Sequence, residues 1–386
     1  MEVVVTRVQS KSDLKAFINL PWQIYRGDTN WVPPLRGNLK SRLDLSKHPF
    51  IGSADAALFI ARCDGRAVGS IAAINNRNHI DFHKEAVGFF GFFECVHDHK
   101  VAEALFSHAA DWLRTHNLEI MRGPTSYSTN EECGLLIDGF DRPPVIMMPY
   151  NPLYYVDLVE GFGFKKTMDL LAYEITDEVP LPDRLKKTVK LIEKRKKVTT
   201  RRLNVKQIDR EIKCVKEIYN SAWERNWGFV PMTDKEIDRL AADLKPIVDP
   251  DIVRFAEIEG ETVAFVLSLP DFYQALKYTN GRLFPFGLLK LLWHSGKIWP
   301  ARNKIDKIRV LTLGIKKEFR RQGIDALLYY YSYVEGKKKG YRRAELSWIL
   351  EGNTLMNRAL ENMGAKVYKR YRIYDYPLVD TARKAA

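Results

Sequence analysis

Cysteine is scarce in this chain, and it has no long apolar run. The four cysteines among 386 residues form no Cys-x-x-Cys pair, so neither a disulfide framework nor a zinc site is predicted. The longest apolar stretch, Leu283–Trp293, contains Pro285, Gly287 and Lys290 and is too short to span a bilayer. The first residues lack the basic and apolar regions of a secretory signal. A reducing cytoplasm is therefore the expected location.

Basic residues outnumber acidic ones. The chain has 61 Lys and Arg against 48 Asp and Glu, a net charge of +13, and this balance favours anionic partners such as nucleic acid, phosphorylated cofactors or an acidic membrane surface. Much of the excess lies in residues 184–202, where Glu193 is the only acid. This pattern predicts a basic helix. A solvated surface helix and a site for phosphate or lipid headgroups both stay open as its role.

Two landmarks occur twice in the sequence. Residues 59–69 and 255–264 each read as a hairpin whose turn contains glycine, and an Asn…Gly element stands at 151–163 and again at 353–364. Both pairs are separated by roughly 200 residues and keep the same order, as tandem copies of one fold would. The sequence therefore predicts two mixed α/β domains.

The predicted domains follow from the repeat. The N-terminal domain is expected at 1–178, a basic linker and helix at 179–198, the C-terminal domain at 199–380 and a tail at 381–386. Hydrophobic periodicity in the second copy predicts, in order, strand 308–315, helix 324–334, strand 344–349, helix 353–363 and a β-rich run at 365–376.

A basic turn containing glycine lies between the strand that ends at Ile315 and the next predicted helix. Backbone N–H groups and the positive end of that helix favour an anion, and Gly323 allows close approach. Arg320 and Arg321 add charge suited to phosphate oxygens. An anion site is predicted here, with an ordinary basic loop as the alternative.

The order of elements and this turn resemble the GNAT superfamily of N-acetyltransferases. Their acyl-CoA signature, (Arg/Gln)-x-x-Gly-x-(Gly/Ala), is similar to residues 320–325, although Asp325 replaces the small residue and is expected to weaken or shift phosphate binding. Asn353 and Gly364 match a later element of the superfamily. The resemblance implies two tandem GNAT-like domains, each a mixed, mostly antiparallel twisted sheet flanked by helices, that use acyl-CoA as co-substrate and no metal. It implies CoA contacts from Leu313, Gly314, Ile315, Arg320, Arg321, Gln322, Gly323, Ile324, Asp325, Ala326 and Asn353.

The first copy resembles the same fold without its CoA signature. Residues 95–100 stand where the glycine-rich turn would be, contain no glycine and include Asp98, so little CoA binding is expected there. Closer still, the chain is similar to a bacterial group of tandem GNAT-like proteins that includes ceramide synthase-like acyltransferases. The runs that carry this similarity are residues 30–35, 88–94, 130–140 and 280–287. The resemblance implies long-chain acylation of a sphingoid amine as one open possibility.

Direct acyl transfer to an amine needs a base for the nitrogen and an acid for the leaving thiolate. The superfamily's usual tyrosine acid is replaced by Leu360, while Tyr155 of the first copy lies about one turn before the corresponding position. Glu345 and Glu351 flank the strand beside the CoA strand, and Glu94 ends the matching strand of the first copy. Glu351, Glu94 and Tyr155 are the predicted catalytic residues, with a solvated or ion-paired carboxylate as the alternative for each glutamate.

The segment Leu283–Trp293 is more apolar than a surface loop requires. Packing between domains, an acyl-chain groove and an interfacial membrane helix are its three possible roles. The sequence thus favours a cytoplasmic N-acyltransferase for a small-molecule or lipid amine, with peripheral contact to the inner membrane face through this segment. The alternatives are a catalytically inactive GNAT-like binding protein and, less favoured, a nucleic-acid-binding protein.

Overall fold

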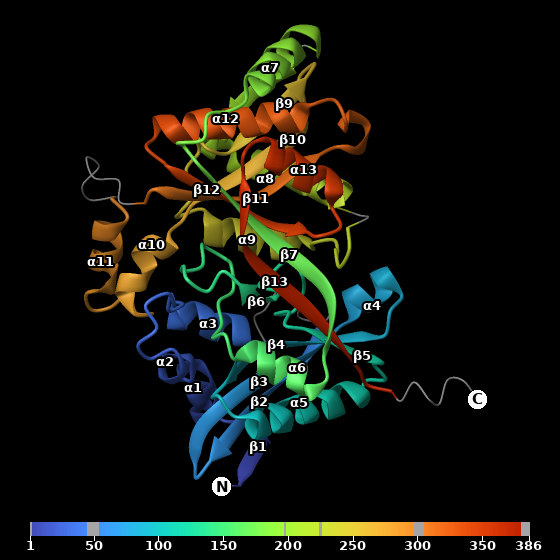
Figure 1. The fold of residues 1–386 in the computed structure, drawn as a ribbon, viewed down its shortest axis with the longest axis vertical. Helices are drawn as coiled ribbons and strands as arrows, with labels where there is room; N and C mark the ends of the chain where they lie inside the picture. The colour runs from blue at the N-terminus through green and yellow to red at the C-terminus, as the bar shows by residue number, and fades with distance from the viewer. Residues whose placement is uncertain (1, 45–53, 197, 224–225, 297–304, 380–386) are drawn as a thin grey trace. The chain divides into compact units, whose positions relative to one another are not determined.

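The computed structural model describes residues 2–44, 54–196, 198–223, 226–296 and 305–379 (Figure 1). The chain forms two compact units with mixed α/β structure, and in each a mostly antiparallel sheet is flanked by helices. The first unit comprises residues 1–170, 279–287 and 369–386, and the second comprises 171–278 and 288–368. The predicted fold class is therefore confirmed. The domain boundaries drawn from the sequence stay a prediction.

The sheet of the first unit has the strand order β1-β2-β3-β4-β5, followed by the second half of β13. Its strands are β1 (Val3–Arg7), β2 (Ala54–Cys63), β3 (Arg66–Asn76), β4 (Val87–Cys95), β5 (Ile120–Gly123), β6 (Leu135–Asp138) and β13 (Lys366–Pro377). Its helices are α1 (Lys11–Asn19), α2 (Pro21–Ile24), α3 (Arg36–Leu43), α4 (Arg77–His83), α5 (His99–Arg114) and α6 (Tyr155–Phe162). Figure 1 shows α5 lying along β2 and β3, against which it packs its apolar face.

The sheet of the second unit has the strand order β8-β9-β10-β11-β12, followed by the second half of β7. Its strands are β7 (Lys165–Thr176), β8 (Val198–Arg202), β9 (Arg254–Ile258), β10 (Glu261–Pro270), β11 (Lys307–Ile315) and β12 (Arg343–Leu350). Its helices are α7 (Asp183–Lys196), α8 (Ile208–Trp223), α9 (Asp234–Leu244), α10 (Tyr273–Leu276), α11 (Gly287–His294), α12 (Ile324–Lys338) and α13 (Thr354–Asn362). The first residue of α11 is assigned to the first unit, and the rest of the helix to the second. Short 3₁₀ turns are η1 (Val205–Gln207), η2 (Lys277–Thr279) and η3 (Lys317–Phe319).

The predicted hairpins are present in both units. β2 pairs with β3 across Asp64 and Gly65, and β9 pairs with β10 across Glu259 and Gly260. All four turn residues have positive φ, between 49° and 84°. This left-handed conformation matches the twist of the flanking strands and explains the glycine in each turn.

Each unit has one central pair of parallel strands, and the ladder between them is shorter than the first strand of the pair. The ladder between β4 and β5 runs from Val87 to Phe89, but β4 continues to Cys95. The ladder between β11 and β12 runs from Lys307 to Val310, but β11 continues to Ile315. A β-bulge interrupts the register of each of these longer strands with its other neighbour. The ends of β4 and β11 therefore carry backbone groups outside the parallel ladder, which positions both candidate sites.

The last strand belongs in part to the first unit. The guanidinium of Arg122 on β5 donates two hydrogen bonds of 2.8 Å to the carboxylate of Asp375 on β13. Arg122 also donates to Glu85 at 3.2 Å. Arg372 on β13 donates to the buried carboxylate of Asp169 at 2.7 Å. These ion pairs and the antiparallel ladder with β5 hold residues 369–377 in the sheet of the first unit.

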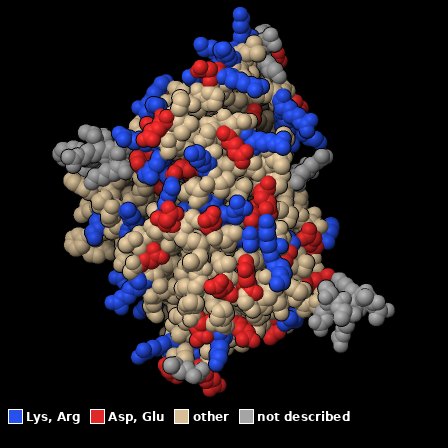
Figure 2. Space-filling model, viewed as in Figure 1, with Lys and Arg blue, Asp and Glu red and all other residues tan. Residues whose placement is uncertain are grey.

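The basic segment 184–196 is a helix, as predicted. α7 packs on α12 through Val189 and Ile192, while Lys186, Lys187 and Lys190 are exposed. Figure 2 shows Lys and Arg side chains gathered over this helix at the end of the second unit. Among the described residues, no helix combines the length and the apolar character needed to cross a membrane.

Candidate active site

Glu94 stands near the end of β4, just after the bulge. Phe92 has a φ of 48°, and the register between β3 and β4 shifts between Ser70 and Ala72. This kink lies where β4 has already left the ladder with β5. A bulge commonly re-aims the side chains that follow it. Glu94 is thereby presented beside the start of α6.

Tyr155 binds both the side chain and the backbone at this strand end. Its hydroxyl donates to Glu94 Oε2 at 2.8 Å and accepts from the backbone N–H of Cys95 at 2.8 Å. The neighbouring Tyr154 donates to the carbonyl of Cys95 at 2.7 Å. Asn151 fixes the entry to α6, because its side chain accepts from Leu136 N at 2.7 Å and donates to Leu136 O at 3.1 Å. The structure thus brings the predicted residues Glu94 and Tyr155 into direct contact.

Aromatic residues complete the surroundings of Glu94. The hydroxyl of Tyr25 lies 3.5 Å from Glu94 Oε1 and donates to the carbonyl of Tyr150 at 3.2 Å. Tyr25 is buried and stacks on Trp31 with ring centroids 4.8 Å apart. Sequence reasoning missed Tyr25, because it is far from Glu94 in the chain. The nearest signal in the sequence was the run at 30–35, which contains its stacking partner Trp31.

Burial controls the proton affinities in this cluster. Removal of water raises the pKa of Glu94 from 4.5 to about 8, although the hydrogen bonds from Tyr155 and Tyr25 oppose the shift. The residue as a whole is only partly buried, but its carboxyl group lies out of contact with water. Burial also raises the pKa of Tyr155 and of Tyr25 well above its ordinary value. Near neutral pH the cluster therefore holds a carboxyl that gains or loses a proton and two hydroxyls that keep theirs.

The predicted anion turn lies between β11 and α12 in the second unit. Gly323 is the N-cap of α12 with a φ of 81°, and no side chain caps the helix there. The positive φ favours glycine here, and a Cβ on Gly323 would lie 2.5 Å from the end of the Ile192 side chain of α7, which would have to shift. Arg320 donates to the carbonyls of Ser221 and Ala222 at 3.0 and 2.9 Å, which ties the turn to α8.

The other predicted CoA residues surround this turn. Arg321 is exposed with a φ of 59°, and Asp325 lies in the first turn of α12. Asn353 caps α13, because its side chain accepts from the N–H of Met356 at 3.3 Å. The remaining predicted residues occupy the end of β11, the turn itself or the first turn of α12: Leu313, Gly314, Ile315, Gln322, Ile324 and Ala326.

Glu351 follows β12 in the second unit and is partly accessible to solvent. Its backbone carbonyl accepts a hydrogen bond of 3.1 Å from Asn357 Nδ2. Tyr329 is buried and its hydroxyl donates to Met356 Sδ at 3.3 Å, while Tyr331 donates to Glu193 of α7. Tyr329 and Tyr331 therefore bind the neighbouring helices α13 and α7.

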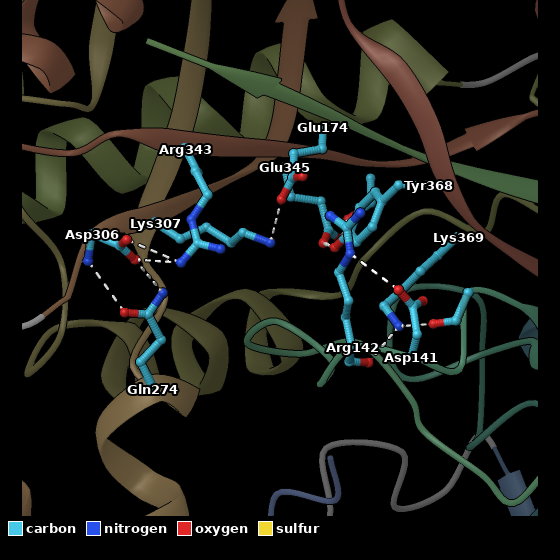
Figure 3. A network of polar contacts seen from close by, with 12 residues as sticks. Asp141, Arg142, Glu174, Gln274, Asp306, Lys307, Arg343, Glu345, Tyr368 and Lys369 are labelled. Carbon is cyan, nitrogen blue, oxygen red and sulfur yellow. Dashed lines mark hydrogen bonds and ion pairs between the residues drawn. The ribbon is translucent and has the colours of Figure 1, made fainter. Parts of the chain in front are cut away.

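Glu345 belongs to a buried polar network on β11, β12 and β13 (Figure 3). Ser347 donates to Glu345 Oε1 at 2.5 Å, and the hydroxyl of Tyr368 donates to its other oxygen. Arg309 in turn donates to Ser347 Oγ at 3.1 Å. This network holds Glu345 in one orientation within the second unit.

Lys307 extends the polar interior of the second unit. Its ammonium lies 2.7 Å from Glu174 Oε1 (Figure 3). In the first unit, Lys369 is fully buried and donates to the carbonyls of Gly139 and Arg142. Sequence reasoning missed these networks, although charged residues within otherwise apolar strands were the available signal.

No group of three His, Cys, Asp or Glu side chains lies close enough to hold a metal ion in the part of the chain that the structure describes. His97 stacks on Tyr154 with ring centroids 4.5 Å apart. Asp98 caps α5 by accepting from the N–H of Lys100 at 2.8 Å. His97 and Asp98 therefore each have a structural contact of their own.

Comparison with other proteins identifies close relatives. Protein YghO of Escherichia coli strain K12 is 37% identical over 372 residues, covering 95% of this chain and 93% of the relative. Bacterial ceramide synthase of Caulobacter vibrioides strain NA1000 / CB15N is 35% identical over 382 residues, covering 98% of both chains. No protein-family model matches the chain.

Solved structures share the fold over nearly the whole chain. A tandem GNAT protein from the clavulanic acid biosynthesis pathway superimposes with a TM-score of 0.57 at 12% identity, covering 98% of this chain and all of the other. A GCN5-related N-acetyltransferase from Sphaerobacter thermophilus gives a TM-score of 0.52 at 15% identity, covering 98% and 96%. The chain belongs to the tandem GNAT family that includes bacterial ceramide synthase. The GNAT fold of this chain supports acyl transfer in general.

Proposed function

We propose that this chain is an acyl-CoA-dependent N-acyltransferase that moves an acyl group from CoA to a primary amine by direct attack. The observation that carries the proposal is the 2.8 Å hydrogen bond between Glu94 and Tyr155 at the end of β4. A carboxyl with a pKa of about 8 is suited to accept a proton near neutral pH, and a hydroxyl that stays protonated is suited to donate one.

In the proposed reaction, the neutral amine attacks the thioester carbonyl carbon, so that a C–N bond forms and the C–S bond breaks. Glu94 as a carboxylate takes the proton from the nitrogen, and Tyr155 gives its proton to the leaving thiolate. The proton on Glu94 then returns to Tyr155 along their 2.8 Å hydrogen bond. One proton has moved from nitrogen to sulfur, and both side chains regain their starting forms.

We propose that the turn from Arg320 to Ala326 binds the phosphates of the co-substrate acyl-CoA. The first N–H groups of α12 lack intrahelical acceptors, and no side chain caps them. The exposed Arg321 adds a positive charge beside them. Asp325 in the first turn acts in the opposite direction, because its carboxylate repels phosphate. The residues of this turn thus fit a phosphate group, with a lower affinity than the same turn would have without Asp325.

The proposed substrates are a long-chain acyl group and a sphingoid-type lipid amine. The support is the relative at 35% identity that is named bacterial ceramide synthase. The apolar segment Leu283–Trp293 suits a lipid acceptor, because several of its large side chains are exposed.

A catalytically inactive GNAT-like binding protein is the second candidate. The observations that favour it are Asp325 at the phosphate turn and Arg320, whose guanidinium is already bonded to backbone carbonyls. Leu360, at the position of the family's usual acid, is buried and has no proton to give. Such a protein would bind acyl-CoA without turnover, or not bind it.

Calorimetric titration with acetyl-, octanoyl- and palmitoyl-CoA, with free CoA as control, tests the proposal together with a thiol-release assay. We expect affinity to rise with chain length, and a sphingoid amine to trigger release of CoA thiol. Arg321→Glu should weaken binding of all four ligands by about tenfold, because a cation is replaced by an anion. Binding without thiol release from any amine would favour the inactive protein, and absence of binding would reject the acyl-CoA proposal.

A further inference from the structure

Large apolar side chains are exposed in succession between Tyr278 and Trp293. The exposed fractions are 44% for Tyr278, 76% for Phe284, 67% for Phe286, 37% for Leu288, 58% for Leu289 and 50% for Trp293. Elsewhere in the described chain, exposed large hydrophobic residues stand singly along the sequence. Single exposed apolar residues are ordinary, but a run of six within sixteen positions marks a binding surface.

The local structure gives the α11 part of this run a fixed apolar face. Leu289 and Trp293 are separated by one helical turn in α11 and therefore share a face. Ser295 ends the helix by donating its N–H to the carbonyl of Leu291 at 2.9 Å. His294 stacks on Tyr278 with ring centroids 3.7 Å apart, which anchors the end of α11. The helix is thus held in place while Leu289 and Trp293 stay exposed.

Charge indicates what this face binds. Residues 272–305 contain no Asp or Glu but six basic residues: Lys277, Arg282, Lys290, Lys297, Arg302 and Lys304. Within the described part of the chain, Lys277, Arg282 and Lys290 are all exposed. Aromatic and leucine side chains next to basic ones, with no acid among them, are typical of segments that lie at an anionic lipid surface. A protein partner would not require the complete absence of acids.

We propose that residues 288–293 of the second unit dock on the surface of an anionic lipid bilayer. Leu289 and Trp293 enter the boundary between headgroups and acyl chains, and Lys290 contacts the anionic headgroups. The inference goes beyond the proposed function, because docking requires no turnover. Under the proposed function it also gives the enzyme access to an acceptor amine that resides in a membrane.

Vesicle flotation of the full chain tests the docking. With vesicles of phosphatidylcholine containing about 30 mol % phosphatidylglycerol we expect the protein to float, and we expect little flotation with phosphatidylcholine alone. High salt should release the protein in part. The double variant Leu289→Ser/Trp293→Ser should bind at least about tenfold more weakly, because two large side chains no longer leave water. Val4→Ser/Val205→Ser, at two exposed apolar positions elsewhere, is the matched control and should bind like the wild type.

A charge pair of variants separates local docking from general attraction. Lys290→Glu should reduce flotation about tenfold, whereas Lys206→Glu, with the same change in net charge at another exposed site, should have little effect. Equal losses in both variants would overturn the proposal, as would equal binding to neutral and anionic vesicles or no binding by the wild type. Thiol release with a water-soluble amine is measured in parallel. Thiol release that persists without vesicle binding would reject the docking proposal and leave the proposed function standing. Absence of thiol release in the wild type would count against the proposed function.

Discussion

The hydroxyl of Tyr155 lies 2.8 Å from the carboxylate of Glu94 and donates a hydrogen bond to it. The same hydroxyl accepts from the N–H of Cys95 at 2.8 Å. Tyr155 is therefore fixed by the strand end from two directions, and Glu94 is held by the helix that closes the unit. This arrangement lets one residue tune the proton affinity of the other, and the first predictions depend on it.

Replacement of Tyr155 by Phe should change the pH dependence of acyl transfer. Its hydrogen bond lowers the pKa of Glu94, so its loss should raise that pKa above about 8. We expect the rising limb of the kcat profile to move to higher pH and kcat to fall by about 10²-fold. Tyr154→Phe is the matched control, because its hydroxyl contacts the carbonyl of Cys95 and not Glu94. A profile that does not move in Tyr155→Phe would contradict this role.

The raised pKa of Glu94 should also appear in the stability of the fold. In the folded state the carboxyl holds its proton up to about pH 8, but in the unfolded state only to about pH 4.5. The unfolded state is therefore favoured progressively as the pH rises through this window. Glu94→Gln, which mimics the protonated acid, should gain roughly 2–4 kcal/mol relative to the wild type between pH 5 and pH 8.

Denaturant unfolding of both proteins at several pH values measures this difference. Glu103→Gln makes the same replacement at an exposed glutamate on α5 and is the control for the loss of a carboxylate as such. A Glu94→Gln difference that does not change with pH would show that Glu94 ionises at an ordinary pKa in the folded protein.

Removal of the carboxylate at residue 325 should strengthen CoA binding. Asp325 lies in the first turn of α12, where it competes with phosphate for the positive helix end. We expect Asp325→Asn to raise CoA affinity by about 3- to 10-fold at low salt and by less at high salt. Asp238→Asn on α9 makes the same charge change at another exposed position. A gain of equal size in that control would assign the effect to net charge rather than to the turn.

The ion pair that attaches β13 to the first unit should contribute to stability. Arg122 is largely buried and donates two hydrogen bonds of 2.8 Å to Asp375. Asp375→Asn should lower the free energy of unfolding by about 1–3 kcal/mol, because a buried guanidinium keeps Glu85 but loses the charge of its closer carboxylate partner. Asp111→Asn, in an exposed pair with Arg114, should cost less than about 0.5 kcal/mol. Similar costs at both sites would contradict the role of Arg122 as an anchor for the last strand.

Local patterns in the sequence predicted much of the fold. The hairpin turns at Gly65 and Gly260, the helix from Ile324 and the strand up to Ile315 depend on backbone conformation and short-range periodicity, so they could be read directly. The division of β13 between the two units could not be read in this way, because the pairing of Arg122 with Asp375 joins residues that are far apart in sequence.

The candidate site was predictable only in part. Glu94 was predicted from its place at the end of the strand that corresponds to the CoA strand, and Tyr155 from its place about one turn before the tyrosine position implied by the GNAT resemblance. Their hydrogen bond and the contribution of Tyr25 depend on tertiary packing that periodicity does not encode. Ile192 beside Gly323 is a further case, since the sequence explained this glycine by close approach or a positive φ and could not show that α7 packs next to it.

The most direct test of the central proposal is thiol release from palmitoyl-CoA with a sphingoid amine acceptor, measured from pH 6 to pH 9 for the wild type and Glu94→Gln. The account predicts that wild-type kcat rises with pH to a plateau above about pH 8, where Glu94 is ionised. It predicts that kcat of Glu94→Gln falls by about 10²- to 10⁴-fold while the affinity for palmitoyl-CoA is unchanged. A Glu94→Gln protein with wild-type kcat and an unaltered pH profile would contradict the account, and loss of activity in Glu351→Gln instead would move the catalytic base to the second unit.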